Sequence, residues 1–181
     1  MSNARTTLDG LTPGTWSIDP THAEVSFIAR HLMVSKVRGK FTEFTGTVEV
    51  AEQLADSVAN VTIKTASVDT GTADRDGHLR SADFFASETY PEMTFVSTSF
   101  DGSTLVGDLT IKGIKKQVKL SIEFGGVMKD PWGNHKAGIT VNGKINRTDF
   151  GLNWNAALET GGVLVSEEIR ISCEFQLVRQ S

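Results

Sequence analysis

The sequence predicts an all-β domain made of about eight antiparallel strands. Apolar and polar residues alternate with a period of two along most of the 181 residues, and helical periodicity is almost absent. Turn residues separate the alternating runs, and the Asp101-Gly102 pair between two of them is a strong hairpin signal. No linker rich in Pro, Gly or Ser divides the chain. We therefore expect a flexible N-terminal segment, residues 1–14, and a single β domain over residues 15–181.

The clearest alternation lies in the second half of the chain. Residues 118–124, 137–146 and 168–177 each place every second side chain in an apolar set. One face of each strand is therefore expected on the core and the other in water. Weaker copies of the pattern predict strands at 25–31, 44–50, 59–63, 93–100 and 105–111.

Two segments, 74–87 and 146–162, break the alternation. Residues 74–87 contain few β-branched residues and fit one or two helical turns. We predict that this lid segment, residues 74–87, covers one end of the sheet with Leu79, Phe84 and Phe85 pointing inward.

Composition and charge argue against several classes of protein. Lys and Arg number 18 and Asp and Glu number 22, which gives a net charge of −4, and no basic block indicates nucleic-acid binding. No stretch approaches the roughly 18 consecutive apolar residues of a membrane-spanning helix. The first twenty residues lack the apolar core of a signal peptide, so a cytoplasmic location is expected.

Catalytic and metal-binding patterns are weak in this sequence. Cys173 is the single cysteine, which excludes an intramolecular disulfide, and it lies on an alternating apolar face where a thiol is usually inert. The four histidines include no pair at the short spacing that presents two metal ligands from one strand or helix. Residues 138–145 resemble a phosphate-binding loop but end in isoleucine, where a hydroxyl is needed for magnesium. We therefore expect no metal site and no catalytic residue.

Eight half-buried strands can form a sandwich or close into a barrel, and periodicity alone does not choose between them. An eight-stranded barrel either fills with side chains or holds one small ligand. Small residues occur among the large apolar ones on the inward faces, and they either thin the lining and leave a cavity or mark bulges and bends. These residues are Ala29, Gly46, Ala59, Gly107, Ala137 and Gly143.

A series of short motifs occurs in a fixed order along nearly the whole chain. The first is Trp-Ser-Ile-Asp-Pro-Thr-His-Ala-Glu-Val-Ser-Phe at residues 16–27, and the last is the strand at 168–175. Between them the motifs lie at residues 31–32 with Ser35, at 37–41 with Phe44 and Gly46, at 78–85 with Tyr90-Pro91, at 107–113 and at 146–152. Together these motifs resemble the YceI-like family of lipocalin-like polyisoprenoid-binding proteins.

This resemblance implies an extended, eight-stranded antiparallel lipocalin-like barrel with an elongated apolar pocket. It also implies that the lid segment covers part of the barrel, and that the protein binds a long-chain lipid rather than acting as an enzyme. No cofactor beyond the bound lipid is implied, and the resemblance is compatible with a homodimer. Many members carry a secretory signal, which this sequence does not display.

We expect the lipid tail to lie along the inward faces of the strands, and polar residues near the mouth to contact its head group. The pocket candidates are Phe27, Ala29, Val48, Val61, Ile63, Phe95, Leu109, Ile111, Leu120, Ile122, Ile139, Val141, Ile171 and Cys173. The head-group candidates are His31, Arg80, Asp149 and Asn153.

The function that fits best is non-catalytic binding, storage or transport of a polyisoprenoid, such as a quinone or a polyprenyl lipid. General binding of amphiphiles, such as a fatty acid or fatty amide, is an alternative. A hydrolase or isomerase acting on a small amphiphile is another, with His31 as its base because this is the histidine expected to face inward. A third is a protein-interaction module whose barrel is filled with side chains.

Overall fold

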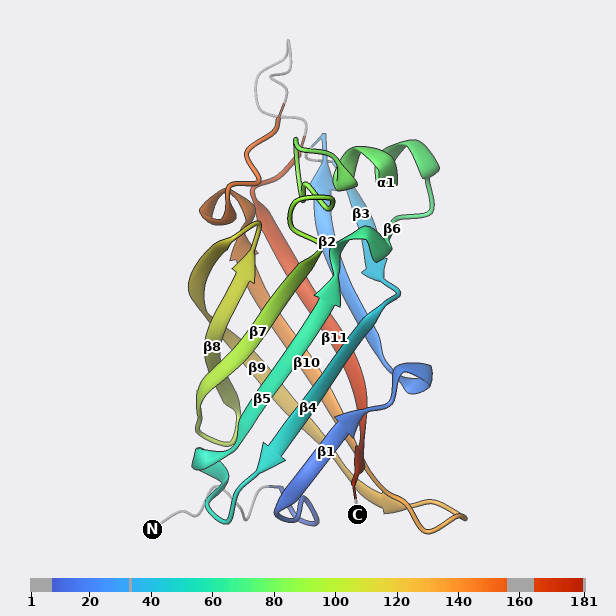
Figure 1. Ribbon diagram of the computed structural model, residues 1–181, viewed down its shortest axis with the longest axis vertical. Coiled ribbons are helices and arrows are strands. Elements are labelled where there is room, and N and C mark those ends of the chain that lie inside the picture. Colours follow the sequence, from blue (N-terminus) through green and yellow to red (C-terminus); the bar gives the residue numbers. More distant parts are fainter. Residues whose placement is uncertain (1–7, 33, 156–164, 181) are drawn as a thin grey trace.

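A computed structural model describes residues 8–32, 34–155 and 165–180 of the chain, and the structural statements below concern these residues (Figure 1). They form one antiparallel sheet and one α-helix, α1 (Ala73–Arg80). The strands are β1 (Gly14–Ile18), β2 (Glu24–His31), β3 (Ser35–Phe41), β4 (Phe44–Val50), β5 (Val58–Lys64), β6 (Val68–Asp69), β7 (Glu92–Phe100), β8 (Thr104–Ile111), β9 (Ile114–Lys129), β10 (His135–Asn146) and β11 (Glu168–Arg179).

The sheet closes into a barrel because β11 pairs with β2 over residues 170–174 and with β1 over residues 177–179. Three strands of the barrel are bent into two halves each, and these halves are β1 and β2, β3 and β4, and β5 and β6. On one side of the bends β1 pairs with β4 and β4 with β5. On the other side β2 pairs with β3 and β3 with β6, so the halves follow each other around the barrel in the same order. Counted in this way, eight strands surround the barrel, in the order β1/β2, β3/β4, β5/β6, β7, β8, β9, β10 and β11. The barrel expected from the resemblance is therefore confirmed, and the sandwich is excluded.

Short 3₁₀ turns produce two of the bends. Pro20–His22 separates β1 from β2, and Thr65–Ser67 separates β5 from β6. Before the second bend β5 pairs with β7. Beyond the bend β6 pairs with β3 and with no strand on its other side in the described part of the chain. The helix α1 and the chain that follows it lie at this end of the barrel (Figure 1), as expected for a lid.

Asp19 stabilises the first bend. Its Oδ1 atom accepts hydrogen bonds from the amide of Thr21 at 3.0 Å and from the Thr21 hydroxyl at 2.7 Å, and its Oδ2 atom lies 3.0 Å from His22 Nδ1. The hydrogen bonds from His22 and Thr21 lower the pKa of Asp19 to about 2. The ionised carboxylate therefore favours the folded state.

Asp19→Asn is expected to lower the free energy of unfolding by about 1 kcal/mol at neutral pH, a value reduced for solvent screening. Because the folded-state pKa lies below the ordinary value of 3.8, the difference between the two proteins should be complete above pH 4 and disappear as pH falls through about 2. Urea unfolding at several pH values measures this difference. A difference that stays constant down to the lowest pH would contradict the assignment.

The end of the barrel opposite α1 is closed by a second apolar cluster. Trp16 is fully buried there, and its Nε1 atom donates a hydrogen bond to the Thr12 carbonyl at 2.9 Å. Leu8 and Leu11 are buried against Trp16 and its neighbours. Residues 8–14, expected above to belong to a flexible segment, therefore pack against the barrel because their leucines cover its apolar base, and residues 1–7 lie outside the described residues.

Several glycines leave room for a large side chain from the neighbouring strand. A Cβ atom at Gly39 would lie 2.3 Å from the ring of Phe27, which is directly opposite in the sheet. At Gly107 it would lie 2.5 Å from the ring of Phe95, and at Gly143 2.6 Å from Leu120. These glycines therefore do not thin the lining, because their neighbours fill the space. Of the six small residues predicted to face inward, Ala29 and Ala59 do line the barrel cavity.

Candidate functional site

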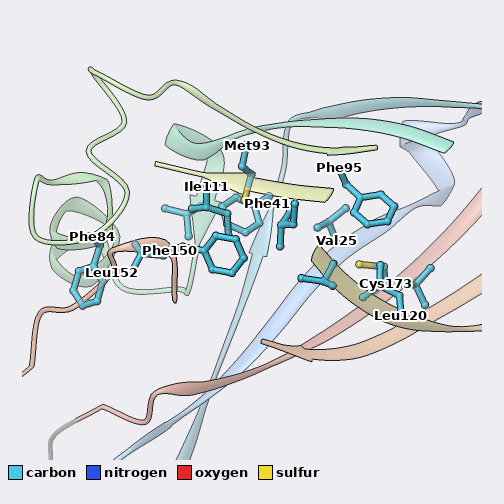
Figure 2. Packing of buried hydrophobic residues seen from close by; sticks show 14 residues of the cluster. Val25, Phe41, Phe84, Met93, Phe95, Ile111, Leu120, Phe150, Leu152 and Cys173 are labelled. Carbon is cyan, nitrogen blue, oxygen red and sulfur yellow. The ribbon is translucent and has the colours of Figure 1, made fainter. Parts of the chain in front are cut away.

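The barrel encloses an apolar cavity of about 610 Å³. Inward side chains from all eight strands of the barrel line it, and all fourteen pocket candidates from the sequence are among them. Figure 2 shows part of this interior, from Phe84 and Leu152 at the lid end, past Phe150 and Ile111, to Leu120 and Cys173. A volume of this size lies within the range of roughly 300 to 1,000 Å³ found for small-molecule sites.

The strand register explains why the candidates meet around one cavity. Val141 lies opposite Ile122 on β9 and opposite Cys173 on β11, so three neighbouring strands place these side chains on one face. In the same way, Phe95 lies opposite Val61 on β5 and Leu109 on β8. Because side chains alternate across a strand, this pairing brings each apolar set to the same side of the sheet.

The cavity reaches the surface at the lid end. Exposed Arg30, Asp74 and Arg75 belong to its lining there, together with half-buried His31 and His78. The opposite end is closed by the buried cluster around Trp16. The cavity is therefore an elongated apolar tube with a polar mouth at the lid end.

The four head-group candidates lie in different places. His31 lines the cavity near its mouth, whereas Arg80, Asp149 and Asn153 are outside the lining. The Nη1 atom of Arg80 points to the Ala66 carbonyl at 3.5 Å, and Asp149 and Asn153 are exposed. Arg80 and Asn153 directly follow the lining residues Leu79 and Leu152 in the sequence, but their own side chains are outside the lining.

Two polar residues of the lid that line the cavity, Arg75 and His78, were not among the candidates. Arg75 donates hydrogen bonds to the hydroxyl and carbonyl of Thr70 at 2.7 and 2.8 Å, which holds the guanidinium beside the mouth. The Nε2 atom of His78 lies 2.9 Å from Asp83 Oδ2, and its ring meets that of Trp154 edge-on at 4.6 Å between centroids. The motif at residues 78–85 was a signal for this region, but it did not indicate which side chains face the cavity.

Arg147 is a buried cation that was not among the candidate site residues. Its guanidinium donates hydrogen bonds to the carbonyls of Ser166, Leu152, Trp154 and Val165, and it lies 5.9 Å from the centre of the Phe84 ring. Burial lowers its pKa below the ordinary value. The side chain therefore joins residues 152–154 to residues 165–166 at the edge of the cavity.

Cys173 faces the cavity and is buried. Burial raises the pKa of its thiol to about 11, so at pH 8 roughly one thiol in a thousand is ionised. No group of three His, Cys, Asp or Glu residues within the described ranges could hold a metal ion. Among the same residues, no helix is long and apolar enough to cross a membrane.

We expect thiol reagents to label Cys173 at least about 100-fold more slowly than an exposed cysteine at pH 8, because its thiolate is scarcer and shielded from solvent. The control is Asn142→Cys in a Cys173→Ala background, which places a cysteine on the exposed face of β10. Labelling followed by absorbance, with and without denaturant, measures both rates. Equal rates in the native proteins would show that position 173 is open to solvent.

A closed antiparallel barrel around an apolar cavity is the architecture of barrels that hold a small ligand. The model of the YceI-like domain matches residues 16–177, and the chain belongs to this family. A UPF0312 protein of Staphylococcus aureus is 41% identical over 166 residues, which cover 90% of this chain and 97% of the relative. A UPF0312 protein of Staphylococcus epidermidis matches with the same identity and coverage.

Solved structures share the fold. BcnA of Burkholderia cenocepacia has a TM-score of 0.72 and 25% identity, covering 90% of this chain and 99% of its own. The YceI protein of Campylobacter jejuni has a TM-score of 0.71 and 33% identity, covering 84% and 90%. A polyisoprenoid-binding domain from Saccharophagus degradans has a TM-score of 0.69, covering 91% and 98%, and at 16% identity it supports the fold alone.

Proposed function

We propose that this protein binds a long-chain polyisoprenoid, such as a quinone or a polyprenyl lipid, in the barrel and stores or carries it without chemical change. The observation that carries the proposal is the apolar cavity of about 610 Å³, closed at one end and bordered by polar side chains at the other. An amphiphile with a long apolar tail and a small polar head matches this distribution. The Saccharophagus degradans domain of similar fold is described as polyisoprenoid-binding.

The size of the cavity sets a scale for the tail. If each carbon group occupies about the volume of a water molecule in the liquid, roughly 30 Å³, then 610 Å³ holds about 20 carbon atoms, or about four prenyl units. Burying one prenyl unit from water is worth about 4 kcal/mol, and association costs about 4 to 15 kcal/mol. Several units are therefore needed, and a short prenyl alcohol should be held weakly.

The relevant competitor for the tail is a membrane, which is as apolar as the cavity. Selectivity must therefore come from the shape of the cavity and from polar contacts to the head group. His31, Arg75 and His78 border the mouth and could donate hydrogen bonds to a carbonyl, hydroxyl or phosphate oxygen. We propose these three residues for the head-group contacts, in place of Arg80, Asp149 and Asn153.

Organic extraction of the purified protein, followed by mass spectrometry of the extract, tests the proposal. Native mass spectrometry of the intact protein gives the stoichiometry. One bound species per chain with repeated C₅H₈ units is the expected result, and its mass identifies the head group. A stoichiometric fatty acid or fatty amide would replace the proposal with general amphiphile binding.

The two remaining interpretations make different demands on the barrel. A protein-interaction module with a filled barrel is disfavoured by the cavity. A hydrolase or isomerase would need a base at the cavity, and His31 lies in the lining. Incubating the extracted lipid with protein should leave its mass unchanged, whereas turnover lost in His31→Ala would favour the enzyme.

A further inference from the structure

The outer surface of the barrel beside the mouth carries a group of basic side chains. Strand register places Arg30 opposite Lys36, and Ile28 between Arg38 on β3 and Arg170 on β11. Lys40 continues the row along β3, opposite Asp69 on β6. We call Arg30, Lys36, Arg38, Lys40 and Arg170 the basic face. All five are exposed, and none forms an ion pair with another described residue.

This arrangement does not serve the stability of the sheet. Like charges directly opposite each other on neighbouring strands, as at Arg30 and Lys36, destabilise a sheet. The chain as a whole carries a net charge of −4, so the basic face is a local departure from its overall charge. Charges are screened over about 10 Å at ordinary salt, so an anionic surface in contact with this face would be attracted despite distant carboxylates.

Apolar side chains lie at the end of the same hairpin. Val34 is 83% exposed and Leu32 is 41% exposed, in the turn between β2 and β3. Leu32 also has a φ of 55°, in the left-handed region that residues other than glycine seldom adopt. Immediately before the turn, His31 faces the cavity and exposed Arg30 lies at the rim of its mouth. The turn between β2 and β3 lies at the same end of the barrel as α1 (Figure 1), so the exposed apolar tip and the basic face lie beside the mouth.

We propose that this end of the barrel docks on an anionic lipid surface. The basic face contacts the head groups while Val34 and Leu32 enter the boundary of the acyl region, the combination by which proteins lie on membranes without crossing them. Exposed aromatic rings, on which nucleic-acid bases would stack, are absent from the basic face, so a membrane fits better than a nucleic acid. Docking would place the mouth of the cavity against the bilayer. A role for docking in lipid binding rests on the proposed function.

Flotation of the purified full chain with vesicles tests the docking. We expect binding to vesicles of phosphatidylcholine mixed with phosphatidylglycerol, little binding to phosphatidylcholine alone, and release at high salt. Lys36→Glu/Arg38→Glu and, separately, Val34→Asp should each lower the partition coefficient by about tenfold or more. The vesicles carry no isoprenoid, so this experiment tests docking separately from lipid binding. Docking can fail while lipid is still found in the extract of the protein, and docking can succeed when the extract contains no lipid.

Matched controls come from elsewhere on the barrel. Lys115→Glu/Lys119→Glu makes the same change of charge on the exposed face of β9, and Trp132→Ser removes an 83% exposed side chain between β9 and β10, at the closed end. Both controls should bind vesicles like the unmodified protein. Three results would each overturn the proposal. One is a loss of vesicle binding in Lys115→Glu/Lys119→Glu equal to that in Lys36→Glu/Arg38→Glu, and another is a loss in Trp132→Ser without a loss in Val34→Asp. The third is the absence of binding to anionic vesicles. Unchanged thermal unfolding confirms that the variants fold.

Discussion

Val141→Trp should lower retention of the bound lipid by more than about tenfold while the barrel stays folded. Val141 lies at the centre of β10, buried and facing the cavity between Ile122 and Cys173. The larger indole would occupy space that the tail otherwise fills, and each displaced CH₂ group is worth about 0.8 kcal/mol. Because the indole enters a cavity rather than a filled core, we expect a change in unfolding free energy of less than about 2 kcal/mol.

The matched control is Asn142→Trp, which places the same side chain on the exposed face of the next residue. Ile122→Trp, opposite Val141 on β9, should repeat the effect from a second strand. Lipid recovered per mole of folded protein, measured by extraction and mass spectrometry, compares the variants. Unchanged retention in both Val141→Trp and Ile122→Trp would remove the inward face from the binding site.

Arg147→Ala should be the most destabilising of the substitutions considered, with a loss of about 3 to 5 kcal/mol in the free energy of unfolding. The guanidinium donates to four backbone carbonyls, and alanine would leave several of them buried without a donor. Arg147→Lys should recover part of the loss, since an ammonium keeps the charge but cannot reach all four acceptors.

Urea unfolding of the three proteins measures these differences. Arg170→Ala is the control, because Arg170 is exposed on β11 and its removal should change the unfolding free energy by less than about 0.5 kcal/mol. If Arg147→Ala does not fold, Arg147→Lys still tests the assignment, with an expected loss of at least about 1 kcal/mol. A lysine variant as stable as the unmodified protein would mean that the four hydrogen bonds contribute little.

The apolar set of the cavity could be predicted because it depends on a local rule. Side chains alternate across a strand, so the residues at Phe95, Ile122 and Val141 face the same way whatever the rest of the chain does. All fourteen candidates line the cavity for this reason. The short helix of the lid was also predicted, from a break in the same alternation, and α1 (Ala73–Arg80) overlaps that segment from residue 74 onward.

The polar part of the site could not be predicted in the same way. A head-group residue must reach the mouth, which depends on how turns direct side chains, and three of the four candidates are directed elsewhere. Arg147 lies two residues before the candidate Asp149, but its hydrogen-bond partners are carbonyls up to 19 residues away. Such contacts join segments that are distant in sequence, and no short pattern records them.

The β class, eight of the eleven strands described and their inward sides follow from the sequence alone, because strand periodicity acts between neighbouring residues. The closure of the barrel through the pairing of β1 and β11, and the covering of its base by Leu8 and Leu11, are visible only in the tertiary structure. The same holds for the space beside Gly39 and Gly107, which Phe27 and Phe95 occupy. Closure, cavity volume and charge grouping depend on pairing between distant segments, which a local pattern does not specify.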